Sequence, residues 1–248
     1  MSDQQISLFD LGSLDAAPPS TTAKTTSKKS AKAATPEPAV AFDPASIPTS
    51  AKVPIPVGTY DSMEAMKVHC AGCQRCDLGS TRTNPVIGRG NPQAKLMIIG
   101  EGPGENEDLT GLPFVGKAGQ LLDKILDSVG LTEDDLFICN VVKCRPPENR
   151  KPTQQEIDAC HPYLMEQIRL VDPPLILLAG GSAVIGLLGD KTGITKIRGT
   201  WREWEGRQCM PVFHPSYLLR NPSKEKGSPK WLMWQDIQEV KRCLEALD

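Results

Sequence analysis

The stretch KLMIIGEGPGENED, residues 95–108, joins a short apolar run to an acidic loop that is rich in glycine. The run Lys95–Gly100 has few charges, which is typical of a short strand covered on both faces. Three later runs share this pattern: Leu136–Val142, Pro174–Gly180 and Gln208–His214. Together the four runs predict the buried strands of one sheet.

Helical periodicity fills the segments between and after these runs, at 117–129, 153–170, 182–188 and 231–247. Thr153 and Glu156 have the spacing of a capping box at the start of the second of these helices. Strands that alternate with helices form βαβ units, and the resulting parallel sheets bind ligands beyond the carboxyl ends of their strands. We therefore expect an α/β fold with its polar chemistry at that edge.

The chain has 248 residues, enough for one α/β domain with residues to spare. Between about residues 10 and 58 the sequence is mostly Ala, Pro, Ser, Thr and Lys, without hydrophobic periodicity. Such a segment cannot bury enough apolar surface to offset the entropy of ordering it. We expect residues 1–57 to form a disordered tail and residues 58–248 to form the domain.

Neither a membrane-spanning apolar run nor the core of a signal peptide is present in the sequence. We expect a monomer that works in the cytoplasm, associated with the nucleoid, and has no membrane partner. The net charge of −2 argues against a general nucleic-acid coat. Residues 191–230, however, carry nine Lys or Arg against three Glu, and this basic stretch suits a DNA partner. A solvated surface with scattered lysines is the alternative.

The eight cysteines predict a metal site rather than disulfides, given a cytosolic chain. Cys70, Cys73 and Cys76 follow one another at two-residue spacing, and Cys144 and Cys160 flank a predicted strand end and helix. Two thiolates from a tight loop and two from elsewhere can complete a four-cysteine site. The spacing leaves both zinc and a [4Fe–4S] cluster open. Two of the remaining cysteines are expected in the core and one is unassigned: Cys139, Cys209 and Cys243.

Polar and aromatic residues follow the strand ends. The loop 100–108 carries four carboxylates that would repel a pyrophosphate, so an uncharged ligand fits it better than a nucleotide. Phe114 can stack on a flat ligand, and Asn140 can read the edge of a base. The string HPSYLLR, 214–220, combines an imidazole, a proline-fixed turn, two apolar residues expected to be exposed, and a cation. Turn, capping and core roles are the alternatives for these residues.

Several motifs occur in a specific order from about Cys70 to the C-terminus. They are GEGPG at 100–104 with Glu107-Asp108 after it, GLPFVGKAG at 111–119, NVVKCRPPENR at 140–150 and HPSYLLRNP at 214–222. In this order they resemble the iron–sulfur, thermostable-type (family-four) uracil-DNA glycosylases. The resemblance implies a three-layer α/β/α sandwich around a four-stranded parallel sheet. It also implies an enzyme of base excision repair that hydrolyses the N-glycosidic bond of uracil in DNA and leaves an abasic site.

The same resemblance implies the site residues. A [4Fe–4S] cluster would be held by Cys70, Cys73, Cys144 and Cys160, with Cys76 outside the ligand set. The uracil pocket would be formed by Glu101, Gly102, Pro103, Phe114, Asn140 and His214, with Glu107 and Asn149 also lining it. Contacts to DNA are expected from Tyr217, Leu218, Leu219 and Arg220.

The chemistry assigns a role to each main residue. Uracil must leave the base stack of the DNA to enter the pocket. There Phe114 would stack on the ring, and the Asn140 amide would pair with N3–H and O4. A neutral His214 donating to O2 would stabilise the uracil anion. Glu101 is our first candidate for orienting the attacking water and Glu107 the second; Glu107 would also restrict the space near C5. Leu218 or Leu219 would wedge into the gap in the DNA and Arg220 would contact phosphate.

Two further hypotheses stand beside this one. A non-catalytic iron–sulfur protein that binds DNA or senses redox state is the alternative, although binding alone needs neither the Glu101 loop nor the His214 string. In the tail, Gln5-Ile-Ser-Leu-Phe9 resembles the pentapeptide with which bacterial repair enzymes bind the sliding clamp. Gln5 would be its anchor and Leu8 and Phe9 its apolar plug, so a sliding clamp is an expected partner.

Overall fold

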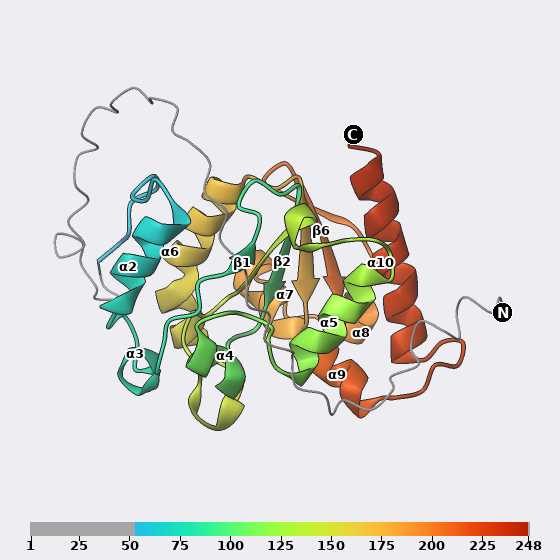
Figure 1. The fold of residues 1–248 in the computed structure, drawn as a ribbon, viewed down its shortest axis with the longest axis horizontal. Coiled ribbons are helices and arrows are strands. Elements are labelled where there is room, and N and C mark those ends of the chain that lie inside the picture. Colours follow the sequence, from blue (N-terminus) through green and yellow to red (C-terminus); the bar gives the residue numbers. More distant parts are fainter. Residues whose placement is uncertain (1–52, 248) are drawn as a thin grey trace, which may run out of the picture. The chain divides into compact units, whose positions relative to one another are not determined.

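The sheet has six strands in the computed structural model, which describes residues 53–247. Its order is β1-β3-β2-β4-β6-β5 (Figure 1). The four inner strands are parallel: β3 (Leu136–Asn140), β2 (Leu96–Gly100), β4 (Leu175–Ala179) and β6 (Arg207–Val212). They match the four predicted runs, so the parallel core is confirmed. Two short antiparallel edge strands were not predicted: β1 (Arg89–Gly90) and β5 (Arg202–Trp204).

The register of the inner strands places their carboxyl ends at one edge. Gly100 pairs with Asn140, and Ala179 pairs with Val212. Every residue of β2, β3 and β4 is buried, which explains why these strands are continuously apolar rather than alternating. Because the parallel strands end at the same height in the sheet, the residues that follow them lie next to one another at its carboxyl edge.

Helices cover both faces of the sheet, as the three-layer expectation requires. Helices α5 (Lys117–Asp127) and α10 (Pro229–Glu245) contact each other on one face. On the other face lie α6 (Gln154–Val171) and α7 (Gly181–Leu188), which also contact each other (Figure 1). These are the four predicted helices. The Thr153–Glu156 capping box is present at the start of α6.

Five further α-helices of the described residues were not predicted. They are α2 (Met63–Ala71), α3 (Leu78–Thr81), α4 (Glu105–Thr110), α8 (Ile194–Ile197) and α9 (Pro215–Arg220). Four of them have at most six residues, too few to show a helical period, and α2, with nine residues, was missed as well. Helix α4 begins inside the acidic loop and has Glu105, Glu107 and Asp108 in its first turn. Carboxylates are favourable there because they face the positive end of the helix dipole. Three of the four carboxylates in the loop therefore mark the start of helix α4.

Helix α9 corrects one expectation about the 214–220 string. Leu218 is 0% exposed and belongs to the core, so it is not a surface residue. The reason is helical geometry: α9 contacts α5, and one side of α9 must be buried there. Leu219, the next residue, is only partly buried. The prediction that both leucines are exposed is wrong for Leu218.

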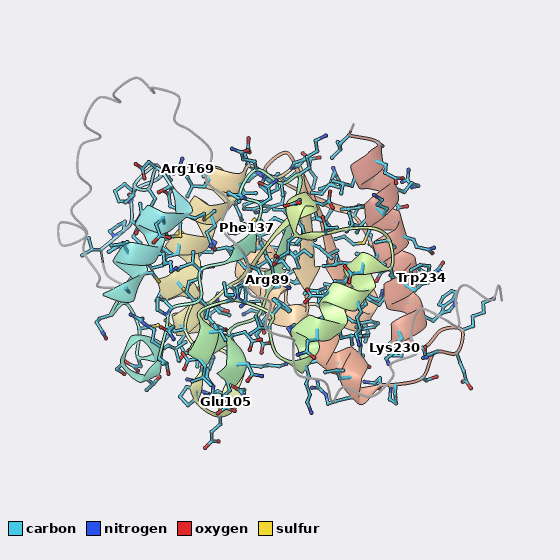
Figure 2. The ribbon with its side chains drawn as sticks, in the orientation of Figure 1. Arg89, Glu105, Phe137, Arg169, Lys230 and Trp234 are labelled. Atoms are coloured by element: carbon cyan, nitrogen blue, oxygen red, sulfur yellow. The ribbon has the colours of Figure 1, made fainter. Side chains whose placement is uncertain are left out.

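The segment before α2 is fixed to α6. The carboxylate of Glu166 accepts hydrogen bonds from the backbone N–H groups of Gly58 (2.9 Å) and Tyr60 (3.2 Å). Arg169, labelled in Figure 2, bonds both Glu166 and the carbonyl of Tyr60. Contacts begin still earlier, since the Val53 carbonyl accepts from Arg75 at 2.7 Å. The boundary expected at residue 58 stays a prediction, and most of the expected tail lies outside the described residues.

Within residues 53–247, no helix has the length and apolar character needed to cross a bilayer.

Candidate active site

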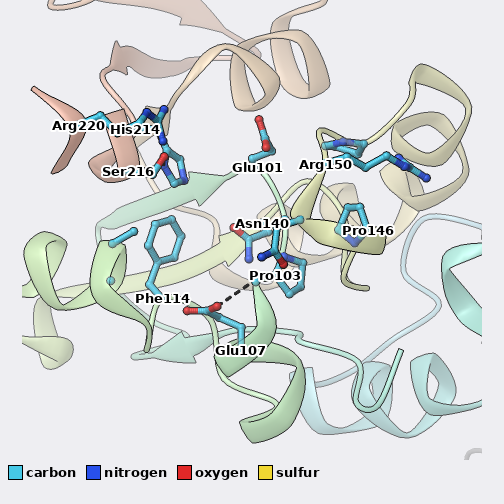
Figure 3. A pocket seen from close by; sticks show the side chains of 16 residues that line it. Glu101, Pro103, Glu107, Phe114, Asn140, Pro146, Arg150, His214, Ser216 and Arg220 are labelled. Carbon is cyan, nitrogen blue, oxygen red and sulfur yellow. Dashed lines mark hydrogen bonds between the residues drawn. The ribbon is translucent and has the colours of Figure 1, made fainter. Parts of the chain in front are cut away.

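A cavity of about 330 Å³ opens at the carboxyl edge of the sheet (Figure 3). It is lined by residues from all four motif regions named above. These include every predicted pocket residue: Glu101, Gly102, Pro103, Glu107, Phe114, Asn140, Asn149 and His214. Ser216 and Arg220 of α9 line it as well. Residues spread over 120 positions of sequence are thus brought to one space by the strand register.

His214 is held in one orientation by the start of α9. It is the N-cap of that helix, and its Nδ1 lies 3.2 Å from the backbone nitrogen of Ser216, which donates to it. The Ser216 hydroxyl lies 2.8 Å from the same Nδ1. Because Nδ1 accepts the backbone N–H, the neutral ring must carry its proton on Nε2. The imidazole therefore offers one N–H donor.

Burial lowers the pKa of His214 to about 4. The nearby Arg220 cation is a smaller cause of the same shift, whereas the carboxylate of Glu107 acts in the opposite direction. At neutral pH the ring is therefore uncharged. A neutral donor can stabilise negative charge without itself needing a counter-ion.

Phe114 forms the opposite wall. Its ring centroid lies 5.7 Å from that of His214, with the planes tilted by 31°. The ring is 6% exposed and its backbone has φ 54°, in the left-handed region. Two glycines make room for it: a β-carbon on Gly100 would collide with the ring, and one on Gly119 would collide with the Phe114 carbonyl.

Asn140 supplies the polar end of the cavity. The residue is 2% exposed, and its carboxamide has no hydrogen-bond partner among residues 53–247. Figure 3 shows the Asn140 amide in the space bounded by Phe114 and His214. A buried amide without a partner has both a donor and an acceptor to offer a ligand.

The two carboxylates of the loop differ in what they bind. Glu107 accepts three backbone N–H groups, from Gly104 (3.1 Å), Val115 (2.9 Å) and Gly116 (2.7 Å), so its oxygens are occupied in fixing the loop. Glu101 accepts one hydroxyl, from Ser182 at 2.5 Å. Its other oxygen has no bond within the described part of the chain. Of the two, Glu101 is the better placed to hold a water molecule.

The remaining predicted residues lie at the rim. Asn149 is exposed, has φ 54°, and accepts from Arg145 Nε at 2.8 Å, so it does not share the burial of Asn140. Arg220 is exposed at the cavity mouth. Tyr217 packs against Phe213 with ring centroids 5.1 Å apart, which limits how far its ring can move.

The cysteines gather around a second, smaller cavity. Cys70, Cys73, Cys144 and Cys160 are all buried and all line it, together with the half-buried Cys76. Across residues 53–247, no three ligand side chains converge on a single-ion site. Four thiolates are the ligand set of a structural zinc ion and of a [4Fe–4S] cluster alike.

Cations surround these sulfurs. Lys143 is 0% exposed, and its ammonium group donates to the Asn140 carbonyl and to Gln167, with no carboxylate partner in the described region. Arg82 donates to Cys144 Sγ at 3.1 Å and otherwise to carbonyls of the 70–73 loop. The Lys143 backbone N–H donates to Cys160 Sγ at 3.3 Å. Buried positive charge beside buried thiols suits an anionic four-thiolate centre.

Burial raises the pKa of Cys144 to about 11 and that of Cys160 to about 12, so each thiol must give up a proton to bind a metal. Cys139 and Cys209 are fully buried in β3 and β6, as expected for core residues. Cys243 lies on α10 beside Glu239.

Several residues that contact the proposed site residues were not predicted from the sequence. Ser216 lies within the 214–220 string, where a serine two residues after His214 is a recognisable capping signal. Ser182 and Lys143 carry no such signal, because their roles depend on contacts across 81 and 24 positions of sequence.

The fold and cavity agree with comparisons to known proteins. Residues 87–238 match the family model described as the uracil DNA glycosylase superfamily. The type-4 uracil-DNA glycosylase of Thermotoga maritima is 45% identical over 185 residues, covering 74% of this chain and 95% of the relative.

Two further relatives agree with this. The type-4 enzyme of Sulfurisphaera tokodaii is 43% identical over 190 residues, covering 73% of this chain and 84% of its own. A type-5 uracil-DNA glycosylase of Pyrobaculum aerophilum is 30% identical over 205 residues, covering 70% and 90%. The chain therefore belongs to the uracil DNA glycosylase superfamily and, within it, to the type-4 family. These relatives are named as enzymes, which favours the catalytic hypothesis over the non-catalytic one.

The buried imidazole predicts a pH-dependent stability. The unfolded chain binds a proton on His214 with a pKa of about 6.5, whereas the folded chain does so at about 4. The unfolded state therefore holds more protons between these values, and the free energy of unfolding falls as pH drops through this window. The loss is on the order of 3 kcal/mol.

Urea unfolding of the wild type and of His214→Asn at pH 7 and about pH 4.5 measures this contribution. We expect the wild type to lose more stability than the variant over this range. Equal losses in the two proteins would show that His214 does not resist protonation.

Proposed function

We propose that this chain removes uracil from DNA by hydrolysing the bond between the base and deoxyribose, the activity for which its type-4 relatives are named. One observation carries the proposal most. A neutral N–H donor, an aromatic face and an unpartnered amide all border a cavity wide enough for one pyrimidine ring. A base in duplex DNA reaches such a cavity only after it is flipped out of the stack.

Asn140 would select uracil. Its amide oxygen can accept from N3–H of the base, and its amide nitrogen can donate to O4. Cytosine presents a donor and an acceptor in the reversed places, so it would leave buried polar groups unpaired. Sites built on hydrogen bonds of this kind discriminate by about 10⁴-fold or more. Phe114 would stack on the ring, and Glu107 would hold the loop that limits space near C5.

His214 would act on the leaving group. Cleavage leaves negative charge on N1 and O2 of uracil, and the Nε2–H of His214 would donate to O2. This bond strengthens as charge develops, so it stabilises the transition state more than the bound substrate. A donor of this kind contributes about 2.7–4 kcal/mol.

Glu101 would orient the attacking water. Ser182 fixes one carboxylate oxygen at 2.5 Å, and the other oxygen can accept a proton from water. The negative charge would also favour the cationic character that the sugar acquires as the bond breaks. Asn149, which was expected among the catalytic residues with Glu101, Glu107 and His214, would act from the rim of the cavity by contacting the nucleotide.

The DNA would lie against α9. Leu219 is the remaining candidate wedge, since Leu218 is buried, and Arg220 would contact a phosphate at the cavity mouth. Tyr217 would support this surface by packing on Phe213.

We further propose a [4Fe–4S] cluster on Cys70, Cys73, Cys144 and Cys160. When bound, it would join the 70–73 loop to the strand end and to α6, a structural role. Arg82 and the Lys143 backbone would donate to its sulfur ligands, and the cluster would balance the buried charge of Lys143 and the partly buried charge of Arg82.

A labelled oligonucleotide with one uracil tests the activity. The wild type should release free uracil and leave an abasic site. Asn140→Asp cannot donate to O4, so its preference for uracil over cytosine should fall by roughly 100-fold or more. Asn91→Asp, the same change at a half-buried position outside the cavity, should keep full selectivity. Unchanged selectivity in Asn140→Asp would place base reading elsewhere, and no release by the wild type would refute the proposed activity.

Iron content tests the cofactor. Cys144→Ala should lose bound iron and visible absorbance, whereas Cys76→Ala, whose thiol lines the same cavity, should retain both. Loss of iron in Cys76→Ala but not in Cys144→Ala would overturn the ligand set. Zinc in place of iron in anaerobically purified protein would overturn the cluster itself.

The remaining expectations concern partners and location. We propose a cytoplasmic monomer that works at the nucleoid, because its proposed substrate is DNA, with a tail preceding the domain at about residue 58. Gln5, Leu8 and Phe9 would bind a bacterial sliding clamp. A peptide of residues 1–15 should bind the clamp, and Leu8→Ala with Phe9→Ala should abolish binding. Equal binding by the altered peptide would refute the motif.

A further inference from the structure

Arg89 reaches the loop that carries Phe114, although it lies on the edge strand β1. Its Nε donates to the Pro113 carbonyl at 3.0 Å, and one terminal nitrogen lies 3.5 Å from the Phe114 carbonyl. The side chain is 13% exposed and lies near the middle of the domain (Figure 2). Arg89 does not line the cavity, and neither the motifs nor the family comparison assigns it a role.

Phe114 needs external support to keep its conformation. A φ of 54° is rare for a bulky aromatic residue and is destabilising by about 1–3 kcal/mol. A residue in that region keeps its conformation only when several contacts fix it. If the backbone at Phe114 relaxed to an ordinary φ, the ring would leave its position opposite His214.

The known motifs supply only part of this support. Glu107 binds the N–H groups of Val115 and Gly116, which follow Phe114. The carbonyl groups of Pro113 and Phe114, on the other side, are bound by Arg89. The loop is therefore fixed on both sides of Phe114. The Glu107 carboxylate accepts from the N–H groups after it, and Arg89 donates to the carbonyl groups of Pro113 and Phe114.

Arg89 is itself fixed by two carboxylates. It forms ion pairs with Asp123 of α5 and with Glu133, which precedes β3. A guanidinium group can do this because its donors spread in a rigid plane and serve several acceptors at once. The Arg89 guanidinium group therefore connects the Phe114 loop to α5 and to the segment before β3, the strand that ends at Asn140.

We infer that Arg89 is a positioning residue for Phe114, which sets the stacking face of the pocket from outside it. The inference rests on the proposed stacking of Phe114 on uracil. Arg89→Gln should leave His214, Asn140 and Glu101 in place but allow the Phe114 loop to shift. A misplacement of about 1 Å at a reacting site can lower the rate by ~100-fold, so we expect kcat/KM for uracil-DNA to fall roughly 10- to 100-fold.

A double-mutant cycle tests this directly. Phe114→Ala, Arg89→Gln and the double variant are compared for kcat/KM and for inhibition by free uracil. If Arg89 acts through Phe114, Arg89→Gln weakens uracil inhibition in the wild type but changes little in the Phe114→Ala background. Equal fold-losses in both backgrounds would overturn the inference, because Arg89 would then act independently of the ring.

Controls separate this result from general destabilisation. Arg169→Gln removes the same kinds of contact, a carboxylate pair and a backbone carbonyl, from a segment that does not line the pocket, and should keep normal kcat/KM. If Arg89→Gln does not fold, Arg89→Lys is used instead. Lysine keeps the positive charge but lacks the planar set of donors that binds several acceptors at once. A Phe114→Ala variant with full activity would refute the proposed stacking itself. Loss in Phe114→Ala with no loss in Arg89→Gln would refute only the role of Arg89.

Discussion

The site depends on one partly buried hydrogen bond, from the Ser216 backbone N–H to Nδ1 of His214. It determines which ring nitrogen carries the proton, and burial keeps the ring uncharged by lowering its pKa to about 4. The proline at 215 favours the helix start that creates this bond. A neutral donor in a fixed place requires no reorganisation when charge develops nearby. In the proposed function Phe114 and Asn140 would serve the same purpose, because together they would hold a uracil ring where its O2 meets that donor.

The strand β3 joins this pocket to the cysteine site. Asn140 ends the strand at the pocket, and Cys144 follows four positions later beside the other three thiols. Lys143 lies between them: its ammonium donates to the Asn140 carbonyl, and its backbone N–H donates to Cys160. A fully buried lysine without a carboxylate is costly unless negative charge lies close by. The four thiolates of the proposed cluster would provide that charge, and the same lysine would then support both the cofactor loop and Asn140.

Much of this arrangement could be predicted from the sequence, and the limits have physical causes. The four inner strands follow from continuous apolar runs, and Thr153 with Glu156 predicted where α6 begins. The short helices α4 and α9 could not be recognised, because six residues do not establish a helical period, and so Leu218 was mistaken for a surface residue. The pocket residues could be named because they lie in family motifs. Ser182, Lys143 and Arg89 could not, because each acts through a partner that is distant in sequence or is a backbone atom.

The central claim is that His214 stabilises the departing base, and a change of leaving group tests it most directly. Single-turnover cleavage of uracil and of 5-fluorouracil, in the same oligonucleotide, can be compared between the wild type and His214→Ala. The fluorinated base leaves more readily as an anion and needs less help from a donor. We therefore predict that the loss of rate caused by His214→Ala is clearly smaller for 5-fluorouracil than for uracil. An equal loss for both bases would contradict the account, because His214 would then act on some other step.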